Sequence, residues 1–142
     1  MTFQIPDIQF WALQLELGRL TFAQYLQHIQ KVTPTPQQQE FVDTVDAGDL
    51  AISVRSGRGP GKSFILGHFI VYYLYKYDDA IIPITGAVFD QLKDTLWKEV
   101  AASYRGLPEY LQNQFALTTE SLRRKSKPNG NFAVIRTASK DK

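Results

Sequence analysis

The sequence contains no cysteine and only two histidines among its 142 residues. The lack of cysteine excludes disulfides, thiol catalysis and zinc sites built on thiolates. His28 and His68 are too few for a multi-histidine metal site, and each lies in an apolar helical pattern that favours a packing or surface role. No apolar run reaches the roughly 18–20 residues of a membrane span, and the N-terminus has no secretion-signal pattern.

An excess of charge of one sign is also lacking, because 16 basic and 14 acidic residues leave a formal net charge of only +2. Such a balance does not by itself indicate a nucleic-acid partner. The hydrophobic fraction of 44% and the charged fraction of 21% are ordinary for a globular protein. The length suits one modest domain. From the composition and the lack of a membrane span or secretion signal, we expect a soluble cytoplasmic protein.

Residues 1–32 are predicted to form a helical appendage of two short amphipathic helices. Asp7 can cap the first helix, which ends near Gly18, and Thr21 can cap the second, which runs through Ile29. We expect this appendage to pack on the core of the protein, with docking onto a partner as the alternative.

A third helix is predicted after an extended Thr-Pro-Thr-Pro segment, with Thr35 as its cap and Pro36 in its first turn. Its first turn carries three consecutive glutamines, residues 37–39. These glutamines could form a solvated polar face. They could also recognise adenine, because a glutamine amide offers a hydrogen-bond donor and an acceptor side by side.

The most informative stretch is rich in glycine and lies between two apolar runs, residues 50–54 and residues 64–70. It consists of Ser56, Gly57, Arg58, Gly59, Pro60, Gly61, Lys62 and Ser63. A strand, a glycine-rich turn and a helix that opens with Gly-Lys-Ser form the phosphate-binding P-loop pattern, although Ser56 replaces its first glycine. Backbone N–H groups can converge on phosphate oxygens, Lys62 can reach the β- and γ-phosphates, and Ser63 can ligate Mg²⁺. The stretch therefore predicts a site for ATP and magnesium.

The rest of the chain alternates between helical and strand patterns. A helix over residues 62–77 is apolar on nearly every side, and residues 78–79 are predicted to form a surface turn rather than a metal-binding acidic pair. A strand over 80–85 and a helix over 88–104 follow. This alternation favours βαβ units and a mostly parallel central sheet.

The final third is predicted to contain a short helix over 108–115 and two strands over 117–120 and 132–136. The link between these strands holds the only concentrated basic run, residues 123–127, which includes four Lys or Arg residues. The run is either a solvated loop or a hairpin tip that contacts the phosphates of DNA, and both interpretations remain open.

An acidic strand is the element that the pattern lacks. A P-loop NTPase needs a second buried strand that ends in Asp or Asp-Glu, which holds the metal and orients water. The apolar strands predicted here end in Arg55, Thr85 or Arg136. We therefore expect the N-terminal portion of a longer protein, which binds ATP without efficient hydrolysis.

Over residues 33–142 the chain resembles the large terminase subunit of tailed bacteriophages or prophages, the ATP-driven motor that packages viral double-stranded DNA into procapsids. The resemblance rests on residues 35–41, residues 54–63, the strand ending at residues 85–86, a helix bearing Gln91 and residues 97–100, and residues 132–138. Terminases commonly lack the first P-loop glycine and carry an arginine inside the loop, as Ser56 and Arg58 do here.

The resemblance implies a P-loop NTPase domain of the ASCE, RecA-like type, and residues 56–63 would bind the triphosphate. Lys62 would take part in catalysis and Ser63 would bind magnesium. Arg58 would be a candidate arginine finger, and Gln38, or its neighbour on either side, would recognise adenine. Double-stranded DNA, the small terminase subunit and the portal protein are the implied partners of a motor that is a homo-oligomer in the host cytoplasm. The family's acidic strand and C-terminal metal-dependent nuclease domain are not matched.

Two alternatives remain open. The glutamines and the basic run would also suit a helicase-like or restriction-type DNA translocase, which continues into a different downstream domain. A non-catalytic interaction module that docks through the N-terminal helices is the second alternative, and it predicts no rise in melting temperature with ATP.

Overall fold

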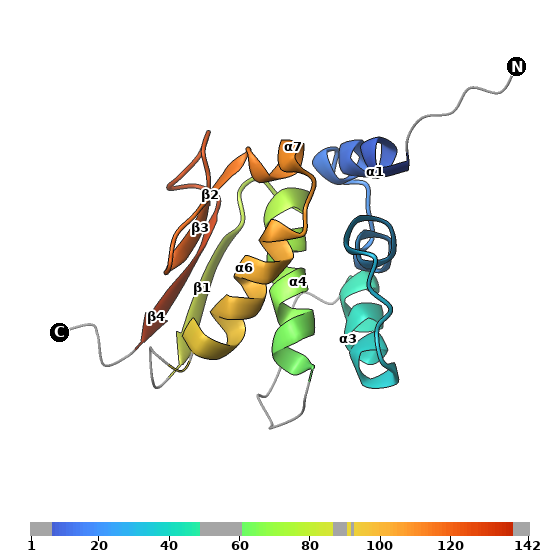
Figure 1. The fold of residues 1–142 in the computed structure, drawn as a ribbon, viewed down its shortest axis with the longest axis horizontal. Helices are drawn as coiled ribbons and strands as arrows, with labels where there is room; N and C mark the ends of the chain where they lie inside the picture. The colour runs from blue at the N-terminus through green and yellow to red at the C-terminus, as the bar shows by residue number, and fades with distance from the viewer. Residues whose placement is uncertain (1–6, 49–60, 87–90, 92, 138–142) are drawn as a thin grey trace, which may run out of the picture.

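The computed structural model describes residues 7–48, 61–86, 91 and 93–137. These residues form a mixed α/β fold with a four-stranded sheet. Figure 1 shows three layers: the sheet, then α4 (Lys62–Lys76) with α6 (Lys98–Arg105), then α1 (Asp7–Glu16) with α3 (Pro36–Asp46). Helix α4 is therefore covered by structure on both sides.

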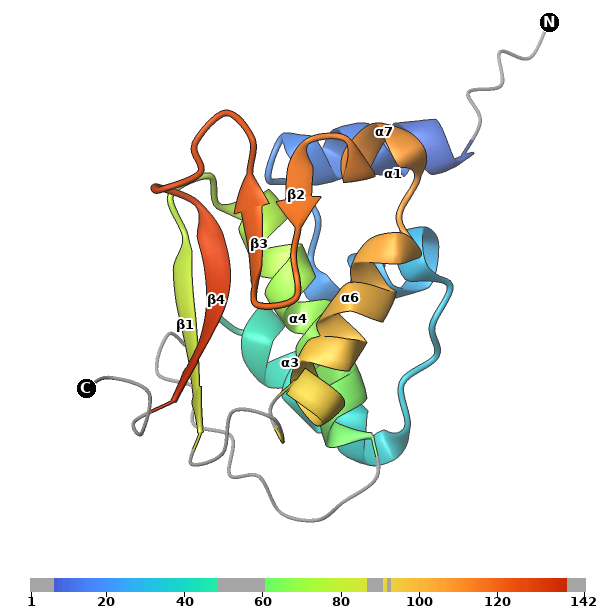
Figure 2. The ribbon, with the colours of Figure 1, turned by 60° about the vertical axis from the view of Figure 1, so that its left-hand side comes forward.

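The sheet contains β1 (Ile81–Gly86), β2 (Phe115–Leu117), β3 (Ser121–Arg124) and β4 (Phe132–Thr137), in the order β1-β4-β3-β2. Strand β1 runs parallel to β4, whereas β3 runs antiparallel to both β2 and β4. The described strands therefore differ from the mostly parallel sheet that was expected. Short links join β2, β3 and β4, which lie side by side in Figure 2, and such links can connect only antiparallel neighbours.

The N-terminal helices pack on the core. After α1, the short helix α2 (Phe22–Gln24) leads into a π-helical segment, η1 (Tyr25–Gln30), which ends at Lys31 with a left-handed φ of 57°. Thr21 caps α2 as expected, because its side chain accepts a hydrogen bond from the backbone N–H of Gln24. The side chains of Phe22 and Tyr25 are completely buried in the same cluster as those of α4.

Helices α3 and α4 form where their local signals predict. Thr35 caps α3 and Pro36 occupies its first position, where a missing N–H costs nothing. Helix α4 buries residues on several faces, which confirms that it is surrounded. Those residues are Ile65, Gly67, His68, Ile70, Val71, Tyr72, Leu74 and Tyr75. Asp78 and Asp79 lie exposed in the turn that follows.

The predicted boundaries are less accurate after β1. The helix expected over 88–104 comprises a π-helical segment, η2 (Lys93–Trp97), and α6, while residues 87–90 and 92 lie outside the described residues. The helix expected over 108–115 is only α7 (Glu109–Gln112). Of the strand expected over 117–120, only Leu117 lies in a strand, as the last residue of β2, and residues 118–120 form the turn between β2 and β3. The hydroxyl of Thr118 closes this turn by accepting hydrogen bonds from the N–H groups of Glu120 (3.2 Å) and Ser121 (2.9 Å).

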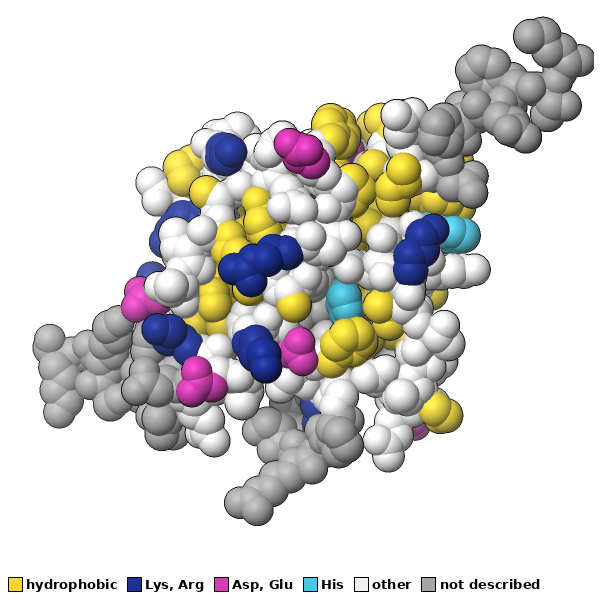
Figure 3. Space-filling model, viewed as in Figure 1, with side chains coloured by type: hydrophobic (Ala, Val, Ile, Leu, Met, Phe, Trp, Pro, Cys, Tyr) yellow, Lys and Arg dark blue, Asp and Glu magenta, His cyan; other side chains and the backbone are white. Residues whose placement is uncertain are grey.

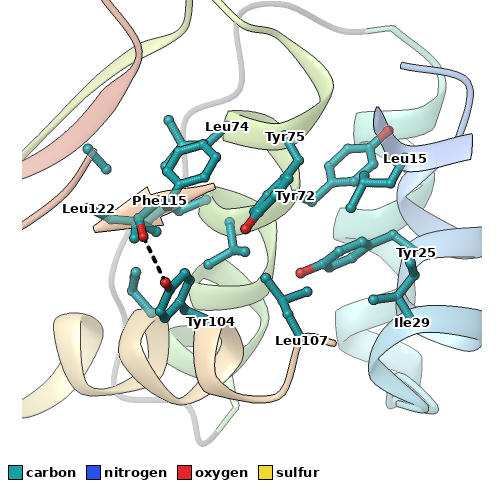
Figure 4. Packing of buried hydrophobic residues seen from close by; sticks show 14 of the residues in the cluster. Leu15, Tyr25, Ile29, Tyr72, Leu74, Tyr75, Tyr104, Leu107, Phe115 and Leu122 are labelled. Atoms are coloured by element: carbon teal, nitrogen blue, oxygen red, sulfur yellow. Dashed lines mark hydrogen bonds between the residues drawn. The ribbon is translucent and has the colours of Figure 1, made fainter. Parts of the chain in front are cut away.

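Aromatic side chains fill the core between the layers. Figure 4 shows Tyr25 and Tyr72 between the N-terminal helices and α4, and Tyr104 and Phe115 between α6 and the sheet. The hydroxyl of Tyr104 donates a hydrogen bond of 3.0 Å to the carbonyl oxygen of Phe115. A buried tyrosine hydroxyl needs a hydrogen-bond acceptor, so the bond from Tyr104 to Phe115 helps to fix how α6 is aligned with the sheet.

Candidate nucleotide-binding site

Helix α4 begins at the Gly-Lys-Ser sequence of the predicted phosphate loop. Gly61 precedes its first residue and has φ +93° and ψ −9°, a left-handed conformation that glycine adopts without strain. The first helical hydrogen bond joins the N–H of Ile65 to the carbonyl of Gly61 at 3.1 Å. The N–H groups of Lys62 and Ser63 therefore belong to the helix start, where partial positive charge favours an anion.

Gln38 connects this helix start to α3. Its Oε1 accepts a hydrogen bond from the backbone N–H of Thr35 at 2.9 Å, and its Nε2 donates one to the carbonyl of Gly61 at 3.0 Å. The residue is only 9% exposed. A Cβ at Gly61 would lie 2.6 Å from this Nε2, so both the backbone angle and the space require glycine there. Gln38 thus aligns α3 with the end of the predicted loop.

A cavity of about 250 Å³ lies beside this contact, between α3 and the first two turns of α4. It is lined by Gln37, Gln38, Glu40, Phe41, Thr44, Gly61, Lys62, Ile65 and Leu66. Its walls are mainly apolar, and polar groups from the first turn of α3 lie at its edge. A small cavity of this kind suits one planar heterocycle held by a few polar groups.

The structure separates the candidate residues identified from the sequence. Ser56, Gly57, Arg58, Gly59 and Pro60 lie outside the described residues, whereas Gly61, Lys62 and Ser63 are described at the start of α4. Gln37 and Gln38 both line the cavity. Gln39 does not, and its side chain instead donates a hydrogen bond of 2.8 Å to Asp43 on the outside of α3.

Several cavity residues were not identified from the sequence. Glu40, Phe41 and Thr44 follow Gln37 at intervals of three, four and seven residues, which places all four on one face of α3. That spacing was visible in the sequence. What α3 would contact was not, because the cavity forms only when α4 packs against it.

Carboxylates do not gather in the described part of the chain. Among the described residues there is no group of three or more His, Asp or Glu side chains placed to hold a metal ion. The described strands β1 and β4 end at Gly86 and Thr137, so neither ends in an acidic residue. Ser63, the one magnesium ligand that the sequence predicts, is the second residue of α4.

The basic run 123–127 is not a single loop. Arg123 and Arg124 belong to β3, and both are half-buried. The guanidinium of Arg123 donates to the carbonyl of Pro128 at 2.7 Å, and that of Arg124 donates to the carbonyl of Leu74 at 3.2 Å. The expected hairpin tip of four basic residues was therefore wrong, because Arg123 and Arg124 belong to β3 and only Lys125 and Lys127 lie exposed in the link that follows. Arg124 joins β3 to α4, whereas Arg123 bonds to that link. Figure 3 shows basic and acidic side chains interspersed on the face that it presents.

A buried polar network joins α4, α6 and η1. Nδ1 of His68 lies 2.8 Å from Oγ of Ser103, and Gln30 donates hydrogen bonds to the carbonyl of Ser103 (3.0 Å) and to the hydroxyl of Tyr25 (2.8 Å). Burial lowers the pKa of His68 to about 4 and raises the pKa of Tyr25, so both groups are neutral near pH 7. The other histidine, His28, stacks on a tryptophan of α1. Both histidines therefore have the packing role that the sequence favours.

Comparisons with models of protein families, with curated proteins and with solved structures found no match to this chain. None of the helices in the described ranges is long and apolar enough to cross a membrane.

Proposed function

We propose that this chain is the ATP-binding part of a DNA-packaging motor of the large terminase type. The observation that carries the proposal is the start of α4: a left-handed glycine followed by Lys62 and Ser63, beside a cavity large enough for a base. The glycine-rich sequence before it, with its internal arginine, supplies the resemblance to terminases. Double-stranded DNA, a small terminase subunit and a portal protein are the partners that this resemblance suggests.

In this proposal each group has a distinct task. The N–H groups at the start of α4 and the ammonium of Lys62 bind the phosphates, and the hydroxyl of Ser63 ligates the accompanying Mg²⁺. Arg58 would stabilise charge on the γ-phosphate. Neither β1 nor β4, in the part of the chain that the structure describes, ends in a carboxylate that could orient water, so we expect nucleotide binding with little turnover.

Nucleotide affinity tests the proposal directly. Replacing Lys62 with alanine removes a charged donor to the phosphates, so the dissociation constant for Mg–ATP should rise by about tenfold to a hundredfold. Isothermal titration calorimetry measures it. Lys125→Ala is the matched control, because Lys125 lies exposed in the turn after β3, which contacts the C-terminal end of α4 at Leu74 and not its start at Lys62. An unchanged dissociation constant in Lys62→Ala would refute the phosphate site.

An interaction module is a second candidate, because an exposed apolar surface supports it. Phe10 and Leu13 of α1 and Leu17 just after it are 41–50% exposed, and Tyr110 of α7 beside them is 57% exposed. Hydrophobic side chains gather over α1 and α7 in Figure 3. This candidate predicts no thermal stabilisation by ATP, whereas a binding protein at 100 times its dissociation constant gains about 2.7 kcal/mol.

A further inference from the structure

A groove of about 330 Å³ lies between η2, α6 and the turn that joins β2 to β3. We call it the basic groove, because its lining includes Lys93, Lys98 and Arg105, together with Ala101, Leu117 and Thr119. Among the described residues that line it there is no Asp or Glu. We propose that the basic groove binds a short acidic segment of a partner protein, in which an apolar residue lies between two carboxylates. This surface is separate from the nucleotide site, and the proposal does not depend on that site.

Two exposed cations stand on one stripe of α6. Lys98 and Arg105 are seven residues apart with Ala101 between them, so all three lie on the same side of the helix. A rise of 1.5 Å per residue separates the Cα atoms of the two cations by about 10 Å along the helix axis. Within the described ranges neither side chain forms an ion pair with a carboxylate. Both positive charges are therefore available to a ligand, one on each side of a small apolar surface.

The opposite wall of the basic groove is held in place by the fold. The indole N–H of Trp97 donates a hydrogen bond of 3.1 Å to the carbonyl of Thr118, which ties the turn after β2 to η2. Thr119 is exposed and lines the groove, so its hydroxyl can bond to the backbone of a bound peptide. A groove that is already formed loses less conformational entropy when a ligand enters it.

An extended peptide matches the spacing of the two cations. Alternate side chains of an extended chain point to the same side, so residues i, i+2 and i+4 can face one surface. At about 3.3 Å per residue, positions i and i+4 lie about 13 Å apart, a span that the flexible side chains of Lys98 and Arg105 can reach. In a segment of the form Glu-x-Leu-x-Glu, the two carboxylates would meet these cations while the leucine packs on Ala101 and Leu117.

Duplex DNA suits the basic groove less well. Asp94, Glu99 and Glu120 each directly follow a lining residue in the sequence. Figure 3 shows acidic side chains beside the basic ones on the face that carries α6. A long polyanion lying across this face would meet these carboxylates, whereas a short segment seated in the groove meets the cations. The sugar-phosphate backbone also offers no apolar side chain to fill the groove.

The experiment titrates the isotope-labelled full chain with the synthetic peptide Gly-Glu-Ser-Leu-Ser-Glu-Gly and follows the backbone amide signals by NMR. We expect weak binding that decreases with added salt and that shifts the amides of α6 and of residues 118–120. Lys98→Ala and Arg105→Ala should each raise the dissociation constant about twofold to fivefold, and the double variant about tenfold. Lys125→Ala is the matched control, because this exposed lysine lies at the other end of β3 from the turn at residues 118–120, and it should change nothing.

Two further probes decide what the basic groove recognises. A peptide with serine in place of the leucine should bind about tenfold more weakly, because it buries less apolar surface. Equal affinity for the two peptides, equal affinity in the double variant, or no shift at millimolar peptide would each refute the proposal. A short DNA duplex that shifts the same amides at lower concentration than the peptide, and loses this effect in the double variant, would assign the surface to nucleic acid and overturn it. None of these results changes the test of the nucleotide site, which rests on Lys62→Ala.

Discussion

Replacing Gly61 with alanine should destabilise the protein by two separable effects. An L-residue at φ +93° costs about 1–2 kcal/mol relative to glycine. The new Cβ would also lie 2.6 Å from Nε2 of Gln38, which forces the amide away from the Gly61 carbonyl and removes a hydrogen bond that contributes about 0.5–1.5 kcal/mol. The expected loss in the free energy of unfolding is therefore about 1.5–3.5 kcal/mol.

Gly48 offers a matched control for the first effect alone. It has a similar left-handed φ of +84°, but a Cβ there would meet no atom of the described residues within 4 Å. Gly48→Ala should therefore lose only about 1–2 kcal/mol. Urea unfolding measures both variants, and an unchanged denaturant slope would show that the difference in midpoint reports stability.

A double-mutant cycle tests the assigned cause. In a Gln38→Ala background the clash and the hydrogen bond are both gone, so Gly61→Ala should cost no more than Gly48→Ala does. Equal losses for the two glycines in the wild-type background would refute the close contact. A loss at Gly61 that persists unchanged in the Gln38→Ala background would also refute the account.

Two further predictions concern the core. His68 has a pKa of about 4 in the folded protein against about 6.5 when unfolded, so only the unfolded chain is protonated between these values and stability falls as the pH drops through them. The free energy of unfolding should fall by about 3 kcal/mol because of His68. Urea midpoints measured at pH 7.5 and pH 4.5 should show this fall in the wild type and not in His68→Gln. An equal pH dependence in both proteins would contradict the assignment. Gly67→Ala should lose about 1–3 kcal/mol, because its Cβ would lie 2.7 Å from the backbone of Glu99 where α4 meets α6; a melting temperature equal to that of the wild type would show that the helices can separate.

The sequence alone predicted the elements whose signals lie within a few residues of one another. Thr35 and Pro36 mark the start of α3, and the Gly-Lys-Ser sequence marks the start of α4. The apolar pattern of α4 also predicted that it would be buried on several sides. Capping, proline geometry and helical periodicity act over one or two turns, so neighbouring residues determine them almost completely.

The tertiary structure decided which distant groups meet. The hydrogen bond from Arg124 to the carbonyl of Leu74 and the contact between Gln38 and Gly61 join segments that no local pattern connects. The three glutamines look alike in sequence, and only the packing of α3 on α4 gives each a different partner. The preference of a glutamine for a helix depends on its own chemistry, but its hydrogen-bond partner depends on which backbone groups the fold brings beside it.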